Sequence, residues 1–117
     1  MGSKSQAKGR RGELELVSVL REYGYDVRPG EPLNYGEEPD IVGLSDIHCE
    51  VKRCQQLRLS EWAEQAARDA EKFHDGMPAI FFRKNREPWM VCMKLADWLK
   101  IYRSYCPPKE SNHNMEV

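Results

Sequence analysis

The stretch from residue 38 to residue 52, EPDIVGLSDIHCEVK, limits the fold more than any other part of this sequence. Two apolar segments flank the turn-forming residues 44–46, a pattern typical of antiparallel strands joined by a tight turn. Because side chains alternate across a strand, the second strand should have one apolar face and one polar face. The polar face would consist of His48, Glu50 and Lys52.

The length of the turn decides where Asp40 lies. A three-residue loop over 44–46 pairs residue 41 with residue 49 and places Asp40 opposite Glu50 on the same face, with Cβ atoms about 4.5–5.5 Å apart. A two-residue loop at Ser45-Asp46 would place Asp40 opposite Val51 and facing away from Glu50. The apolar pattern favours the three-residue loop.

Two carboxylates held this close raise each other's proton affinity unless a cation lies between them. Carboxylate oxygens suit Mg²⁺ or Mn²⁺, and Lys52 could then orient water and stabilise charge developing on a phosphate. The alternative is a surface salt bridge among Asp40, Glu50 and Lys52, which would contribute little to stability.

Apolar periodicity and turn residues divide the rest of the chain into further elements. We predict helices over 12–23, 60–74 and 95–105, and strands over 25–28, 78–83 and 89–93 in addition to the hairpin. The order α-β-β-β-α-β-β-α predicts an α/β domain with a mixed β-sheet flanked by helices. Residues 1–11 should form a basic, flexible N-terminal arm, residues 12–105 the single domain, and residues 106–117 a disordered tail.

Three details of these helices are open to test. The first helix has its apolar stripe at Leu16, Val17, Leu20 and Tyr23. Glu13 lies on the same stripe and would point toward the core side, unless it is only a first-turn glutamate favoured by the helix dipole. We expect Ser60 to cap the second helix. The last helix should be anchored by Leu95, Trp98, Leu99 and Tyr102.

Composition narrows the class of protein. A chain of 117 residues that is 40% hydrophobic fits one domain with a modest core. No apolar run approaches the roughly 20 residues of a membrane span, and no secretory signal is evident, so we expect a cytoplasmic protein. The cysteines form no C-x-x-C pair and should be reduced thiols rather than zinc ligands. They are Cys49, Cys54, Cys92 and Cys106.

The net charge of −1 leaves only local basic patches to attract a polyanion. We predict seven basic side chains as phosphate contacts, although each patch could equally be a solvated surface. They are Lys8, Arg10, Arg11, Arg53, Arg58, Arg83 and Arg86.

Pro39-Asp40, followed after nine residues by Glu50-Val51-Lys52, resembles the signature of the PD-(D/E)XK nuclease superfamily. Together with residues 12–17, GELELV, it resembles more narrowly the archaeal Holliday junction resolvases and their phage-encoded relatives. The resemblance implies a restriction-endonuclease-like core. It also implies that Asp40, Glu50 and the Val51 carbonyl bind the metal and that Lys52 is the catalytic lysine. Glu13 would ligate through water or a second ion, and Gln65 matches a glutamine near the site in many members.

The resemblance implies a metal-dependent endonuclease that uses Mg²⁺ (or Mn²⁺) to cleave branched DNA. Our main hypothesis is a Holliday junction resolvase of phage or prophage type. The setting would be a bacterial, archaeal or phage-infected cell. Paired incisions across a junction need two sites, so a homodimer is expected, with apolar anchors that could instead be core. These are Trp89, Met90, Met93 and Trp98. The alternatives are a fork, flap or single-strand nuclease of phage replication, and a non-catalytic nucleic-acid-binding module of the same fold.

Overall fold

The computed structural model describes residues 2–31 and 38–109, with side chains from residue 9 onward. The elements in this part of the chain are α1 (Gly2–Glu22), β1 (Arg28–Pro29), β2 (Ile41–Val42), β3 (Ile47–Arg53), α2 (Leu59–Phe73), β4 (Met77–Arg83), β5 (Met90–Met93) and α3 (Leu95–Tyr105). The strands form one sheet in the order β1-β2-β3-β4-β5. Strands β3 and β4 are parallel and the other neighbours are antiparallel, so the predicted mixed α/β sheet is confirmed.

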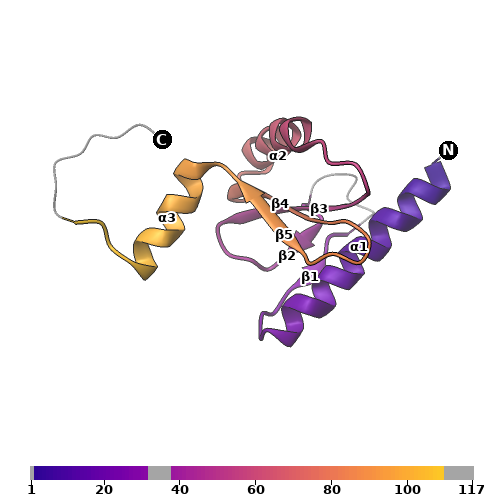
Figure 1. Cartoon of the computed structure of the whole chain (residues 1–117), viewed down its shortest axis with the longest axis horizontal. Coiled ribbons are helices and arrows are strands. Elements are labelled where there is room, and N and C mark those ends of the chain that lie inside the picture. Colours follow the sequence, from indigo (N-terminus) through magenta and orange to yellow (C-terminus); the bar gives the residue numbers. More distant parts are fainter. Residues whose placement is uncertain (1, 32–37, 110–117) are drawn as a thin grey trace.

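Helices α1 and α2 cover opposite faces of the sheet (Figure 1). One core cluster joins Leu16 and Val17 of α1 to Cys49 and Val51 of β3. A second cluster, around Ala66 of α2, includes Ile80 and Phe82, while Phe81 packs against the first cluster. Strand β4 is therefore covered on both faces, which fits its near-continuous apolar run.

The hairpin has the predicted odd register, because Ile41 pairs with Cys49. Gly43 makes the turn possible, since its φ of 123° lies in the left-handed region that favours glycine. A Cβ atom there would also lie 2.5 Å from the Asp26 carbonyl oxygen. With this register, Asp40 faces the same side of the sheet as Glu50.

Helix α1 begins earlier than predicted. We expected residues 1–11 to be a flexible arm and the helix to start at residue 12, but it starts at Gly2. Lysine, glutamine, alanine and arginine are good helix formers, and a polar helical segment has no apolar periodicity to reveal it. The predicted stripe was wrong at Tyr23, which is 78% exposed because it lies past the end of α1.

Smaller corrections concern β1 and α2. The strand predicted over 25–28 is shifted to Arg28–Pro29, the two residues that pair with β2. Helix α2 starts at Leu59, one residue before the predicted cap Ser60, and this start lets Leu59 pack against the second core cluster.

Helix α3 has the predicted bounds but not the predicted anchoring. None of its residues is buried, and Figure 1 shows it projecting from the end of β5 away from the sheet. Helices α1 and α2 occupy the two faces of the sheet, and α3 extends from the end of β5 instead of packing on either face. Of the predicted tail, residues 106–109 have no helix or strand, and residues 110–117 lie outside the described part.

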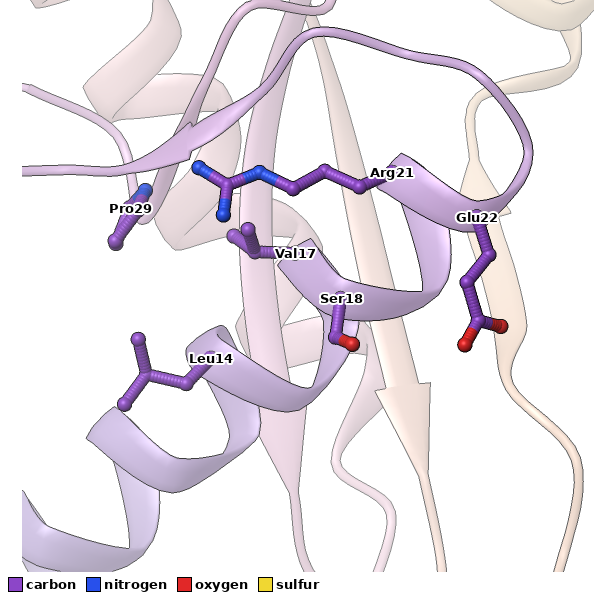
Figure 2. A pocket seen from close by; sticks show the side chains of 6 residues that line it. All are labelled: Leu14, Val17, Ser18, Arg21, Glu22 and Pro29. Carbon is purple, nitrogen blue, oxygen red and sulfur yellow. The ribbon is translucent and has the colours of Figure 1, made fainter.

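Four further observations concern the contacts, surface and cysteines of the fold. Arg21 ties α1 to the chain before β1, because its Nε donates to the Val27 carbonyl at 3.0 Å. The hollow beside it is lined by Leu14, Val17, Ser18, Arg21, Glu22 and Pro29, and includes none of the predicted catalytic residues (Figure 2). All four cysteines are free, and Cys49 is fully buried in the core. In the described residues, no helix has the length and apolar character needed to cross a membrane.

Candidate active site

Asp40 is fixed at the point where β2 begins. Its backbone N–H donates to the Cys49 carbonyl at 3.1 Å, and its Oδ2 accepts the Val51 N–H at 2.8 Å. The carboxylate thus takes the place of a backbone acceptor next to β3. In a strand, the N–H and C=O of one residue point to the same neighbour, so the Val51 carbonyl also faces the side of Asp40.

Glu50 projects from the face of β3 that lies under α2, as alternation predicted. Its Oε1 lies 2.7 Å from Nε2 of His48, which is fully buried on the same face. The other ring nitrogen of His48, Nδ1, lies 2.8 Å from both carboxylate oxygens of Asp75. Ligand-type atoms of His48, Glu50 and Asp69 all lie within 4.8 Å of one another. Glu50 is therefore bordered by a histidine on one side and by Asp40 on the other.

The carboxylates at this site do not titrate alike. Burial and then the charge of Glu50 raise the pKa of Asp40 to about 8. Burial also acts to raise the pKa of Glu50, but hydrogen bonds to His48 and Asp40 outweigh it and bring that pKa below its usual value. Burial raises the pKa of Glu13 as well, although Arg10 opposes the change. Of the Asp40 and Glu50 carboxyl groups, Asp40 is therefore the one whose pKa favours keeping a proton.

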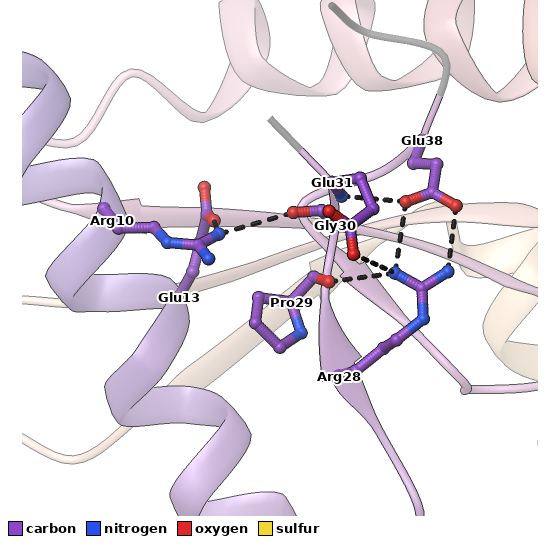
Figure 3. Close-up of polar contacts among 7 residues, drawn as sticks. All are labelled: Arg10, Glu13, Arg28, Pro29, Gly30, Glu31 and Glu38. Carbon is purple, nitrogen blue, oxygen red and sulfur yellow. Dashed lines mark hydrogen bonds and ion pairs between the residues drawn. The ribbon is translucent and has the colours of Figure 1, made fainter. Parts of the chain in front are cut away.

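Glu13 reaches the site from α1. The charge of Glu13 raises the pKa of Asp40, and the charge of Glu50 raises the pKa of Glu13. The three carboxylates therefore lie together. Gly12 permits this approach, because a Cβ there would lie 2.6 Å from Cγ of Arg53 on β3. Arg10 partly neutralises Glu13 at 3.3 Å and also donates to the Gly30 carbonyl at 3.3 Å (Figure 3).

Lys52 is near the cluster, but Gln65 makes no polar contact with it. The charge of Lys52 helps to lower the pKa of Glu50, and its Nζ lies 5.9 Å from the centre of the Trp62 ring on α2. Gln65 is exposed on α2, and within the described residues no hydrogen bond joins it to Asp40 or Glu50.

The predicted phosphate contacts differ in how they are held. Arg83 lies 2.5 Å from Glu15 of α1, and Arg53 lies 3.9 Å from the same carboxylate. Arg58 is 3.8 Å from Glu61, and both side chains are well exposed. Arg11 and Arg86 are exposed. The side chain of Lys8 lies outside the described residues.

Arg28 and Glu38 form a separate group of polar contacts at the start of β1. Both oxygens of Glu38 accept hydrogen bonds from Arg28, at 3.2 and 2.9 Å, and Glu38 also accepts the Glu31 N–H at 2.8 Å (Figure 3). These contacts bring residue 31 next to residue 38.

The donor set fits a hard divalent cation. Asp40, Glu50 and Glu13 supply carboxylate oxygens, and the pKa of Asp40 is raised by burial and then by the charges of Glu50 and Glu13, which a bound cation would offset. Sequence reasoning placed His48 on the face of Glu50 but assigned it no role. No sequence pattern links it to Asp69 or Asp75, so neither of these residues was predicted.

Comparison with known proteins identifies the family. Residues 38–114 match the sequence profile of the family described as "Phage putative PDDEXK endonuclease". The chain therefore belongs to this PDDEXK endonuclease family. The matched residues include Asp40, Glu50, Lys52 and Gln65 but not Glu13. Membership makes this protein a PDDEXK-type nuclease.

Two known proteins are similar to this chain. Protein D14 of Escherichia phage T5 is 26% identical to this chain, and the match covers 83% of the chain and 75% of that protein. The structure of Hjc, a Holliday junction resolvase of Archaeoglobus fulgidus, matches with a TM-score of 0.55 and 22% identity. That match covers 71% of this chain and 73% of Hjc. At this identity the match establishes the fold, so the predicted restriction-endonuclease-like architecture is confirmed.

Proposed function

We propose that this protein is a metal-dependent endonuclease that hydrolyses phosphodiester bonds in branched DNA, with the four-way Holliday junction as its preferred substrate. The observation that carries the proposal is the meeting of Glu13, Asp40 and Glu50, from three separate elements, beside the Lys52 ammonium group. A nuclease needs such a cluster because both its metal and the scissile phosphate must be held at one point.

The roles of the residues follow from their positions. Asp40, Glu50 and the Val51 carbonyl would hold Mg²⁺ or Mn²⁺, with Glu13 binding through water or a second ion. A divalent cation bound there supplies a more acidic water and neutralises charge on the phosphate. Lys52 orients the attacking water and stabilises charge that develops on the phosphate oxygens. Gln65, exposed on the same helix as Trp62, is available to contact DNA beside the cluster.

The preference for branched DNA has two supports. The fold matches that of Hjc, whose title describes a Holliday junction resolvase, and the motif resemblance points to the same group. The family and the phage T5 relative favour a phage-infected or prophage-carrying cell, with action in its cytoplasm.

Resolution of a junction requires two incisions and therefore a homodimer, and exposed apolar side chains are present that could form its interface. Met90 on the edge strand β5 is 52% exposed, and Trp98 on α3 is 45% exposed. The Trp98 and Tyr102 rings stack at 4.8 Å on the exposed surface of α3. Trp89, in contrast, packs against the first core cluster and is not available as an anchor.

One assay tests the proposal. Purified protein is incubated with a labelled four-way junction, a fork, a flap and plain duplex, in Mg²⁺ or in excess chelator. We expect the junction to be cut fastest and only with metal. Glu50→Gln and Asp40→Asn should abolish cleavage and retain DNA binding, whereas Glu22→Gln, a change at an exposed position of α1, should behave as wild type.

Each other outcome contradicts part of the proposal. Cleavage that persists in chelator would exclude metal dependence. Faster cutting of the fork or flap would favour the replication nuclease. Tight binding of DNA without cleavage under any metal would indicate a non-catalytic module.

A further inference from the structure

His48 is the one histidine among the described residues that is fully buried, and both of its ring nitrogens face carboxylates. A buried imidazole satisfied only by Asp75 would be an ordinary core histidine. Here the second nitrogen lies 2.7 Å from Oε1 of Glu50, a carboxylate of the candidate active site. That distance is typical of a charge-assisted hydrogen bond.

We propose that His48 is a positioning residue that is anchored by Asp75 and fixes one oxygen of Glu50, so that the other oxygen is presented to Asp40 and to a divalent cation. This inference rests on the proposed function, because it assigns the part that His48 plays in the same site. Carboxylates that ligate metals are commonly oriented by such hydrogen bonds, and the loss of the partner weakens metal binding.

The anchor is built into the backbone. Asp75 lies in the turn between α2 and β4, between His74 at φ 53° and Gly76 at φ 136°. That turn is pressed against the start of β3, since the Met77 N–H donates to the Asp46 carbonyl at 2.7 Å. A Cβ atom on Gly76 would lie only 2.3 Å from the Asp46 carbonyl carbon. The turn and β3 therefore fix the position of Asp75 relative to His48. Because the imidazole is also hydrogen-bonded to Glu50, it fixes the position of the Glu50 carboxylate in turn.

Packing further restricts the imidazole ring. The Phe73 ring of α2 lies 5.9 Å from the ring of His48, centre to centre, at an angle of 40°. With both nitrogens bonded and one side covered by Phe73, the ring cannot turn without breaking two hydrogen bonds. Both bonded nitrogens also leave His48 without a free atom to accept a proton from water, so it acts through Glu50 rather than on the substrate.

The alternative role for His48 is direct metal ligation together with Glu50 and Asp69. The geometry favours positioning, because Nε2 and Oε1 are at hydrogen-bond distance from each other rather than spread around an ion. The two roles predict different effects of Asp69→Asn. A ligand set of three loses affinity when Asp69 is changed, whereas positioning by His48 does not involve Asp69.

The test measures Mn²⁺ affinity by titration calorimetry without DNA, and cleavage of the four-way junction as a function of Mn²⁺ concentration. His48→Gln should weaken Mn²⁺ binding by about 10- to 100-fold. Cleavage should fall at low Mn²⁺ and recover largely at saturating Mn²⁺, because the ligands themselves remain. Asp75→Asn, which keeps the imidazole but weakens its anchor, should shift affinity in the same direction by a smaller factor. If His48→Gln fails to fold, the Mn²⁺ affinity of Asp75→Asn tests the positioning role instead.

His74→Asn is the matched control, since His74 is exposed and its left-handed backbone suits asparagine. It should leave affinity and cleavage unchanged. Affinity of His48→Gln within twofold of wild type would overturn the inference and make His48 a core residue only. An electron spin echo signal of an imidazole nitrogen bound directly to Mn²⁺, together with weak binding by Asp69→Asn, would overturn it in favour of ligation. Wild-type protein that neither binds Mn²⁺ nor cuts DNA would contradict the proposed function as well, whereas an active wild type with an unaffected His48→Gln contradicts this inference alone.

Discussion

At the scale of single residues, the uneven protonation of Asp40 and Glu50 has a measurable effect on metal binding. The raised pKa of Asp40, about 8, means that a cation at this carboxylate must displace a proton at neutral pH. We therefore expect the affinity for Mg²⁺ or Mn²⁺ to rise by roughly tenfold per pH unit toward pH 8 and then to level off. Calorimetry at pH 7 in buffers of different ionisation enthalpy should count about one proton released. An affinity that is constant between pH 6 and pH 8 would contradict this assignment.

The same groups make the stability of the metal-free protein depend on pH. Asp40 keeps a proton in the folded state that the unfolded chain releases above its ordinary pKa of 3.8, so its contribution falls as the pH rises toward 8. Burial acts to lower the pKa of His48, but hydrogen bonds to Glu50 and Asp75 raise it to about 9. The resulting stabilisation is complete below 6.5, the ordinary value for histidine, and is lost as the pH rises through 9.

Both effects lower the stability as the pH rises from 6.5 to 8, and the effect of His48 continues to about pH 9. Urea unfolding in chelator should therefore give a lower free energy of unfolding at pH 9 than at pH 6.5. Added Mg²⁺ should restore more stability at pH 9, where no proton has to leave Asp40. A metal-free protein that is equally stable at both pH values would argue against the protonation of Asp40 and His48.

At the scale of elements, the close contact between α1 and β3 sets the place of Glu13. Gly12→Leu would drive a side chain into Arg53 and Val51, so α1 must move away from the sheet. We expect a loss of about 1–3 kcal/mol in the free energy of unfolding, as for other overpacked sites, together with slower cleavage because Glu13 is displaced.

Gly9→Ala is the matched control for this change, since nothing lies within 4 Å of a Cβ at that position. It should leave cleavage unchanged and stabilise the helix by about 0.5–1 kcal/mol. Chemical denaturation and single-turnover cleavage measure the two effects. Wild-type stability in Gly12→Leu would show that α1 does not depend on this contact.

At the scale of the whole molecule, the basic side chains should separate into two groups. Arg86 is exposed, so Arg86→Ala should weaken binding to all DNA sequences alike and reduce the salt dependence by about one phosphate contact. Arg83 is paired with Glu15, so Arg83→Ala should also lower the melting temperature. Fluorescence anisotropy at several salt concentrations and thermal denaturation distinguish the two. An unchanged salt dependence in Arg86→Ala would remove it from the DNA surface.

The exposed apolar residues of α3 bear on assembly. We expect a dimer in sedimentation at micromolar concentration, and a monomer when Trp98 and Tyr102 are both replaced by serine. Tyr23→Ser is the control, because Tyr23 is even more exposed but lies outside α3, directly after the end of α1. A wild-type monomer that stays monomeric with junction DNA would favour a single-nick fork or flap nuclease over a resolvase.

The sequence by itself determined the hairpin and most of the element order. The pairing of Ile41 with Cys49 follows from turn length and the period of two, which are local properties of the chain. The same alternation placed His48, Glu50 and Lys52 on one face. The bounds of α3 were also correct, because apolar periodicity is a local signal that survives in the folded structure.

Only the tertiary structure decided which distant groups meet. Asp75 reaches His48 from 27 positions away in the chain, and Glu15 of α1 pairs with Arg83 of β4 from 68 positions away. The exposure of α3 likewise depends on the tertiary arrangement, in which α3 extends from the end of β5 instead of packing on a face of the sheet. No local pattern carries such information, because these contacts depend on how helices pack on the sheet and on which side chains the packing brings within hydrogen-bond distance.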